Sequence, residues 1–426
     1  MTIRLALQAF PVLMGVLWSC CVHAQPLDTL KLTLPAAETQ LLQKNIPLLA
    51  QKFNIDAAKA AVITARLWDN PQVTVENVLY NHTTKKWFDF SYEGQNTLQV
   101  EQLFKIAGQR NKAVKLAQSS VRMTEYQFFD LLRTLRFSLH DNFYDLYYKQ
   151  QSLQTFSRQI AFLRQIVKVF EQQKAMGNIA PKEIIRIRSL LYDLQHDALE
   201  LEKDIQQTQS DLALLIRVPA TVSIQPQLPD PVPQLSAGTL SYQTLLDTAK
   251  ANRYDLKIAQ ENVQYNHMNL RLQRSLAVPD VQLGFSYDKQ GNFERNYNGL
   301  NLSMPLPFFN RNQGNIKMAK AELENSKIQL NGTEDQLEHD VMNSLQQALK
   351  TEKLLQEFDP GFEEEYTTMM HEVEKNYGLH HLGLLEFIDL YDAYRSNVLK
   401  MNELKYNRLN ALEQINFATG ASIFHL

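Results

Sequence analysis

Two acidic residues near the C-terminus, Asp389 and Asp392, have the clearest potential for chemistry in this chain. They lie three residues apart in a segment with helical periodicity, which places both carboxylates on one face of a helix. Paired carboxylates attract cations, and several copies of the pair around one axis would repel each other until a cation bound. A charge pair on a helix is more often an ordinary solvated face, so both interpretations stay open at this point.

Three histidines lie in the same part of the sequence, at positions 371, 380 and 381. Imidazole is a common ligand of transition metals, which makes a metal site conceivable. No cysteine and no Glu-x-x-His spacing supports one, and an adjacent His pair on a turn more often meets solvent or a partner. The 11 methionines are scattered and form no ladder for soft metals. We therefore predict neither a metal site nor a cofactor.

Enzymatic motifs are not visible. The sequence has no nucleophile with its base, no phosphate loop and no glycine-rich nucleotide turn, so an enzyme is not expected. The net charge of -3 is spread without a basic stripe, which argues against nucleic acid as a partner. Small basic clusters, Arg110 with Lys112 and Lys85 with Lys86, are expected to be surface charge, although Lys85-Lys86-Trp87 could meet lipopolysaccharide phosphates.

The first 24 residues are typical of a signal peptide. Arg4 precedes an apolar stretch over residues 5–18, and Val22-His23-Ala24 is a small-x-small cleavage site. Cys20 and Cys21 are the only cysteines, so cleavage after Ala24 leaves a chain without thiols. The alternative is a lipoprotein processing site with Cys20 acylated. No later run of 18 or more apolar residues predicts a transmembrane helix.

The rest of the chain contains an internal duplication. An ungapped offset of 208 residues aligns several identical or similar residues: Leu32 with Leu240, Thr33 with Ser241, Leu48 with Leu256, Asn54 with Asn262, Arg66 with Arg274, Pro71 with Pro279 and Val73 with Val281. In each copy a polar cap opens a helical stretch of about 35 residues, a proline ends it, and an alternating strand follows. Each half is therefore expected to build the same unit.

Long helices dominate both halves. Residues 109–176 contain no Gly or Pro and predict a rod of roughly 100 Å. Residues 177–181 predict a turn, and residues 182–216 a return helix with a 4-3-4-3 coiled-coil seam at Ile187, Leu191, Leu194, Ala198, Leu201, Ile205, Thr208, Leu212 and Leu215. Prolines in the connector over 218–238 preclude helix.

The second half shows the same plan with interruptions. Helices are expected over 241–278, from about residue 314, and over 384–419, with a turn at 378–383. Gly332 and Pro360-Gly361 predict a kink that the first half lacks.

Strand pairs follow the first helix of each half. They are predicted over 72–80 and 97–102, and over 281–287 and 300–304, each with alternating apolar and polar residues. Two hairpins cannot close a barrel, and open strand edges are not tolerated in lipid. If the strands enter a membrane, several chains must share one barrel.

This arrangement resembles the TolC family of outer-membrane efflux proteins over essentially the whole mature length. The segments that carry the resemblance are Leu32-Thr33-Leu34 with Asn45, Pro71 and Pro279 before strands, the run from Phe308 to Gly314, and the run from Leu384 to Ala393. The details also resemble the heavy-metal (cobalt-zinc-cadmium type) efflux branch. The family often has a Ser near the hairpin tips, where this chain has Ala180 and Gly383, and this departure puts the adaptor contact in doubt.

The resemblance implies a mainly α fold with a small β part: long antiparallel coiled-coil helices, plus two β-hairpins that give four strands to a trimeric twelve-stranded barrel. It implies a homotrimer in outer-membrane lipid with a helical tunnel in the periplasm. The implied partners are a periplasmic adaptor (membrane fusion protein) and an inner-membrane RND-type transporter. Asp389 and Asp392 match carboxylates at the periplasmic gate. The implied adaptor-docking tips contain Gly177, Ala180, Pro181, Gly378 and Gly383.

We therefore expect a signal peptide (1–24), a first repeat (25–217), a Pro-rich linker (218–238), a second repeat (239–420) and a short tail (421–426). The expected function is that of a passive exit duct in a tripartite efflux system, conducting substrates that include metal cations. The alternatives are a duct for type I protein secretion, which shares the fold, and a periplasmic coiled-coil scaffold without a channel.

Overall fold

The computed structural model describes residues 28–177, 179–229, 236–291, 294–357, 362–378 and 381–425. The expected signal peptide, with Cys20 and Cys21, lies outside these ranges. Among the described helices, none combines the length and apolarity that a membrane crossing requires.

The two halves share one plan. The first half consists of β1 (Asp28–Thr33), α2 (Leu34–Lys44), α3 (Ile46–Arg66), β2 (Gln72–Asn77), β3 (Tyr80–Asn81), β4 (Lys86–Trp87), β5 (Asn96–Phe104), α4 (Gln109–Ala175) and α5 (Pro181–Ile216). After β6 (Val222–Gln227), the second half consists of α6 (Tyr242–Asn252), α7 (Tyr254–Ser275), β7 (Val281–Asp288), β8 (Tyr297–Ser303), α8 (Gln313–Glu357), α9 (Phe362–Gly378) and α10 (Leu384–Thr419). Within the described ranges, β1, β3 and β4 occur only in the first half, and α8 and α9 of the second half correspond to the single helix α4.

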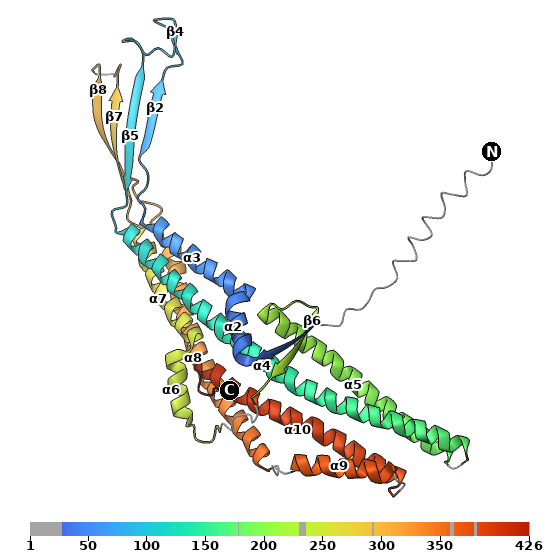
Figure 1. Ribbon diagram of the computed structural model, residues 1–426. Coiled ribbons are helices and arrows are strands. Elements are labelled where there is room, and N and C mark those ends of the chain that lie inside the picture. The colour runs from blue at the N-terminus through green and yellow to red at the C-terminus, as the bar shows by residue number, and fades with distance from the viewer. Residues whose placement is uncertain are drawn as a thin grey trace, which may run out of the picture.

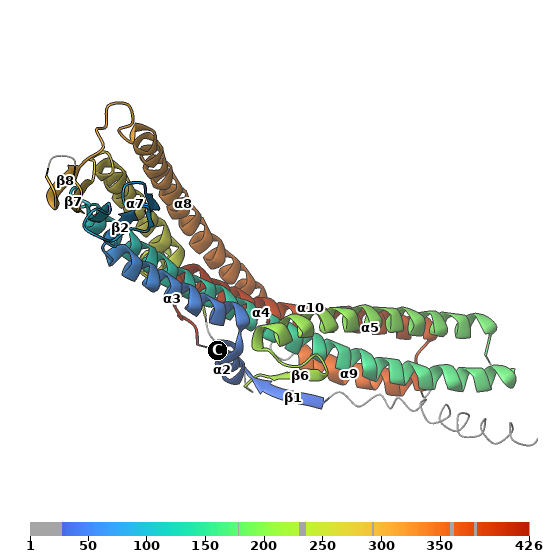
Figure 2. The ribbon, with the colours of Figure 1, turned by 90° about the horizontal axis from the view of Figure 1, so that it is seen from above.

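The molecule is elongated, with the sheet at one end and two helical turns at the other (Figure 1). Helices α3, α4, α7 and α8 run from the sheet to the middle of the molecule. From there α4, α5, α9 and α10 continue to the far end, where the α4–α5 and α9–α10 turns lie (Figures 1 and 2). The long axis is set by α4, whose 67 residues give it a length of about 100 Å.

The long helical pair of the first half is confirmed. Helix α4 ends one residue before the predicted boundary, and α5 begins at Pro181, whose fixed φ suits the first helical position. The predicted seam of α5 is buried at most of its positions: Ile187, Leu191, Leu194, Ala198, Thr208 and Leu212. Apolar burial along this seam therefore holds the pair together.

The opening helix of each repeat is divided into two helices, which corrects the single 35-residue helix predicted for each. The breaks are at Asn45 and Arg253, equivalent positions under the 208-residue offset, and both residues are buried in extended conformation. Asn45 accepts a hydrogen bond from the backbone N–H of Leu48 (3.1 Å) and donates one to the carbonyl of Leu215 (3.0 Å). The polar contacts of these two side chains stabilise the breaks.

Strands from the two predicted hairpins form one antiparallel sheet in the order β2-β5-β7-β8. One continuous row of paired residues crosses it from Val73 through Val100 and Phe285 to Leu300. The adjacent row, on the opposite face, runs from Thr74 through Gln99 and Ser286 to Gly299. The apolar face is exposed, with Leu300 89% accessible and Val75 70%. The predicted alternation is confirmed, and the two hairpins join into one sheet with open edges at β2 and β8.

The linker holds an element that the sequence did not predict. Strand β6 pairs in parallel with β1, with Leu32 opposite Pro226. Proline is tolerated on such an edge because its missing N–H need not face a partner. The linker is thus tied to the start of the first repeat.

In the second half, α8 runs through Gly332 without interruption. The predicted interruption at Pro360-Gly361 falls outside the described residues, between α8 and α9. Helix α10 has the predicted bounds and ends at Gly420, which has φ +67°. A side chain on Gly420 would crowd the backbone of Arg253, with a Cβ to nitrogen distance of 3.2 Å.

Candidate functional site

Asp389 and Asp392 lie near the start of α10, six and nine residues after its N-cap residue, Gly383. The buried side of this part of α10 carries Phe387 and Tyr391, which are 0% and 1% exposed. Asp389 is exposed and Asp392 half-buried, so both carboxylates avoid the core. The predicted common face is consistent with this burial pattern.

The aspartates have a cationic neighbour that sequence reasoning missed. Arg395 Nη2 lies 3.7 Å from Asp392 Oδ1, and its Nη1 lies 3.0 Å from Asp197 Oδ2 on α5. The i, i+3 spacing of Asp392 and Arg395 was visible in the sequence, whereas the contact with Asp197 joins positions 198 residues apart. Within one chain, Arg395 therefore offsets part of the negative charge.

At the first tip, Gly177 lies just after α4 and has φ +79°, a backbone conformation that a residue with a Cβ adopts only with strain. Ala180 is the N-cap of α5 and accepts a hydrogen bond from the Glu183 N–H (3.0 Å). Space around Gly177 is open, so glycine is required there by the backbone and not by packing.

At the second tip, Gly378 ends α9 and Gly383 is the N-cap of α10. Gly383 has φ −76° and open space around it, so nothing in the backbone requires glycine there. The two tips lie together at the end of the molecule opposite the sheet (Figures 1 and 2).

An aromatic cluster joins the helices behind both tips. The rings of Tyr377 and Phe387 stack with centroids 4.0 Å apart, and Phe162 of α4 stacks on Tyr391 at 6.5 Å. Phe170 of α4 packs against Tyr377 at 6.0 Å. Burial raises the pKa of Tyr377 and Tyr391, so both hydroxyls stay neutral. The cluster connects α4, α9 and α10 and fixes the relative position of the two turns.

The three histidines near the second tip lie partly outside the described residues. His371 and His381 belong to the described residues, while His380 lies outside them. Across the described ranges, no group of three or more His, Cys, Asp or Glu side chains is placed to hold a metal ion.

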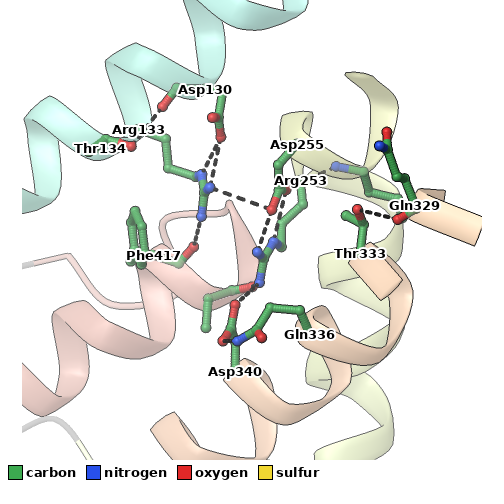
Figure 3. Close-up of polar contacts among 12 residues, drawn as sticks. Asp130, Arg133, Thr134, Arg253, Asp255, Gln329, Thr333, Gln336, Asp340 and Phe417 are labelled. Atoms are coloured by element: carbon green, nitrogen blue, oxygen red, sulfur yellow. Dashed lines mark hydrogen bonds and ion pairs between the residues drawn. The ribbon is translucent and has the colours of Figure 1, made fainter. Parts of the chain in front are cut away.

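A polar junction in the middle of the molecule ties the break between α6 and α7 to three other helices (Figure 3). Arg253 bonds Asp255, lies 2.8 Å from Asp340 of α8, and donates to the carbonyl of Ala418 at 3.4 Å. Arg133 of α4 donates to the carbonyl of Phe417 at 2.9 Å. Both arginines thus satisfy carbonyls at the C-terminal end of α10.

These charges are mutually stabilising. Burial alone would lower the pKa of Arg253, but the hydrogen bonds that its guanidinium donates to Asp255 and Asp340 raise the pKa above its ordinary value. Burial would raise the pKa of Asp255, but the hydrogen bonds and the positive charge of Arg253 outweigh it and lower the pKa below its ordinary value. The junction therefore stays ionised, and each partner depends on the others.

A second buried ionic contact lies nearby. His140 of α4 is placed between two carboxylates, with Nε2 2.9 Å from Glu38 of α2 and Nδ1 2.9 Å from Glu413 of α10. Burial opposes protonation, but the two glutamates raise the pKa of His140 to about 9. The imidazolium links the first helix of the first repeat to the last helix of the second.

Comparison with known proteins agrees with this architecture. A sequence model of the family described as "Outer membrane efflux protein" matches residues 39–216 and 245–358. The cobalt-zinc-cadmium resistance protein CzcC of Cupriavidus metallidurans is 21% identical over 375 residues, covering 86% of this chain and 84% of CzcC.

Solved structures share the fold. A membrane protein from Pseudomonas aeruginosa superposes with a TM-score of 0.73 at 15% identity, over 91% of this chain and 93% of its own. The CmeC outer membrane channel of Campylobacter jejuni gives a TM-score of 0.73 at 12% identity, over 91% and 85%. The matched ranges of the family include all of α4, α5, α7 and α8 and exclude α10, so they do not test the roles of Asp389 and Asp392. With more than half of its length matched, the chain belongs to the outer membrane efflux protein family.

Proposed function

We propose that three copies of this chain form an outer-membrane exit duct whose helices enclose a tunnel in the periplasm. The observation that carries the proposal is the four-stranded sheet, with an exposed apolar face and a polar opposite face. An exposed apolar face suits lipid and a polar face suits an aqueous lumen, which is the pattern of transmembrane barrels.

The sheet edges support sharing between chains. Strands β2 and β8 each have one unpaired edge in the described chain, and an unpaired backbone is costly in lipid. Joining β8 of one copy to β2 of the next, three times, closes a twelve-stranded barrel and removes every edge. A periplasmic scaffold has no need of this exposed apolar face, which counts against that alternative.

The cargo is proposed by likeness to CzcC, whose name concerns resistance to cobalt, zinc and cadmium. We propose that the duct conducts metal cations delivered by an inner-membrane RND-type transporter through a periplasmic adaptor that docks on the two tips. Asp389 and Asp392 form the proposed gate, and an N-terminal signal peptide is the proposed export signal. Cargo in such a system is selected by the partners, so type I secretion remains the competing function of the same duct.

Membrane fractionation and planar-bilayer recording test the proposal together. A heat-modifiable trimer in the outer membrane with ohmic conductance is the expected result. A monomeric product in the periplasm contradicts it. Deletion of the gene in a strain with the cognate transporter should lower tolerance to cobalt, zinc and cadmium, whereas unchanged metal tolerance with lost export of a protein would favour secretion.

A further inference from the structure

The four connections between helices and sheet carry a band of exposed apolar side chains. Its members are Leu67, Trp68, Ile106, Leu276, Val278, Leu306, Phe308 and Phe309, with Trp68 60% and Phe309 95% accessible. Trp68 also packs edge-on against Phe104 at the end of β5. Aromatic residues at such a position are typical of the level of lipid headgroups. We call these eight apolar residues, of which Trp68, Phe308 and Phe309 are aromatic, the aromatic band.

Immediately on the helical side of the aromatic band, the sequence becomes strongly basic. The segments 66–71, 105–115, 271–280 and 305–320 contain ten Lys and Arg residues and two Asp residues, a net charge of +8 in a chain whose total is -3. We call the ten cations the basic collar: Arg66, Lys105, Arg110, Lys112, Lys115, Arg271, Arg274, Arg311, Lys317 and Lys320. All lie within about two helical turns, or roughly 10 Å, of the sheet connections.

The cations of the basic collar are largely uncompensated. Among the described residues, Lys105 alone of the ten makes a recorded ion pair, with Asp69 at 2.9 Å, and both side chains are exposed to solvent. Most of the remaining nine are exposed. Uncompensated charge of one sign at this density is unfavourable unless an anion binds. This contrasts with the middle of the molecule, where Arg253 and His140 are each placed between carboxylates.

Two of these cations are positioned by groups that do not neutralise them. The Arg110 guanidinium lies 3.9 Å from the centroid of the Trp68 ring and donates to the carbonyl of Arg66 at 3.4 Å. Lys112 Nζ donates to the carbonyl of Ala107 at 2.6 Å. Beside them is a cavity of about 150 Å³ whose lining includes Trp68, Arg110 and Lys105, together with Asp69, the ion-pair partner of Lys105. The Trp68 ring and backbone carbonyls orient the two positively charged side chains, and each cation can still bind an anion.

We propose that the basic collar binds the phosphates of anionic phospholipids in the leaflet that faces the helices. The proposal rests on the proposed membrane position of the sheet. The headgroup layer adds about 5–8 Å to each side of the hydrocarbon core, so it overlaps most of the collar, which reaches roughly 10 Å from the sheet connections. The collar adjoins the aromatic band, which continues the apolar face of the sheet. Lipid is therefore favoured over a soluble anionic partner, and the collar fixes the depth of the trimer in the bilayer.

The chain offers a built-in probe, because its three tryptophans are Trp18, Trp68 and Trp87. Trp18 lies in the predicted signal peptide, so replacing Trp87 by Phe leaves Trp68, at the collar, as the sole tryptophan of the mature protein. This protein is reconstituted into phosphatidylcholine bilayers with a minor fraction of brominated phosphatidylglycerol or, separately, of brominated phosphatidylcholine. Quenching of Trp68 then reports which lipid is enriched beside it. We expect local enrichment of phosphatidylglycerol on the order of fivefold, reduced in 1 M salt.

A matched pair of variants identifies the side chains responsible. The collar variant changes the exposed residues Arg66, Lys115, Arg274 and Lys317 to Gln, and should lose most of the preference for phosphatidylglycerol. The control changes four exposed lysines away from the collar to Gln, at Lys44, Lys52, Lys168 and Lys353, and should retain it.

The outcomes separate this inference from the proposed function. Absence of quenching by either lipid overturns the membrane position itself. Equal quenching by both lipids at low salt leaves the duct intact and overturns the collar as a lipid-binding surface. A preference that persists in the collar variant, or that is lost equally in the control, overturns the assignment to these side chains.

Discussion

The ring of Tyr377, on the last turn of α9, stacks on the ring of Phe387, on the first turn of α10, with centroids 4.0 Å apart and planes 13° apart. The contact closes the second tip from inside, and Phe162 and Phe170 extend it to α4 of the first tip. Two turns that are about 200 residues apart in the chain are thereby held as one surface.

The first prediction concerns this aromatic cluster. Phe387→Ala should lower the free energy of unfolding of the tip by about 3–5 kcal/mol, because it removes a fully buried ring. Hydrogen exchange should rise at α9 and the start of α10 while the sheet is unaffected. Leu385→Ala, at a position 69% exposed, is the control and should change exchange little. Equal exchange in the two variants would show that the cluster does not organise the tips.

The second prediction concerns docking at the tips. Gly177→Val should strain the turn by about 1–2 kcal/mol, because φ is +79° there, and should weaken capture of the adaptor without reducing trimer yield. Gly332→Ala serves as the control, since Gly332 lies within α8, outside both tips, and has open space around it. Pull-down of the adaptor and export assays in cells check both variants. Normal capture by Gly177→Val would argue that the first tip does not dock.

The third prediction concerns the gate. The double variant Asp389→Asn, Asp392→Asn should lower cation selectivity and block by trivalent cations in planar-bilayer recordings, with folding unchanged because both side chains lie outside the core. Arg395→Gln should act in the opposite direction, since it removes the cation 3.7 Å from Asp392. Wild-type selectivity in both variants would falsify the gate assignment.

The fourth prediction concerns pH. His140 has an ordinary pKa of 6.5 and a folded-state pKa of about 9, so its protonation favours folding. The contribution, about 3 kcal/mol, should be complete below pH 6.5 and be lost as the pH rises through 9. Thermal unfolding between pH 6 and 10 checks this. His140→Gln should remove most of the slope over this interval, and an unchanged slope would assign the pH dependence to other groups.

The fifth prediction tests the two faces of the sheet. Leu283→Arg, on the apolar face opposite Leu302, should cost about 2–4 kcal/mol if the site lies near the bilayer centre, and trimer yield should fall. Gln282→Arg introduces the same charge one residue earlier, on the polar face beside Glu101, and should be tolerated. Equal yields would contradict the assignment of the faces.

Much of the fold was predictable because it depends on local pattern. Absence of Gly and Pro predicted α4 to within one residue, and the seam of α5 follows from apolar residues at heptad spacing. The duplication and the alternation in the strands fixed the order of elements and the two faces of each hairpin. These features depend on neighbours within a few residues, which the chain itself displays.

Other features were decided only by tertiary structure. Strand β6 forms in a proline-rich linker because β1, almost 200 residues earlier, supplies its hydrogen-bonding partner. The breaks at Asn45 and Arg253 persist because distant carbonyls and carboxylates, at Leu215, Asp340 and Ala418, satisfy their side chains. The ion pair between Asp197 and Arg395 likewise joins groups that are far apart in the sequence. The free energy of each contact depends on groups far away in sequence, and periodicity does not encode which of these groups the folded chain brings together.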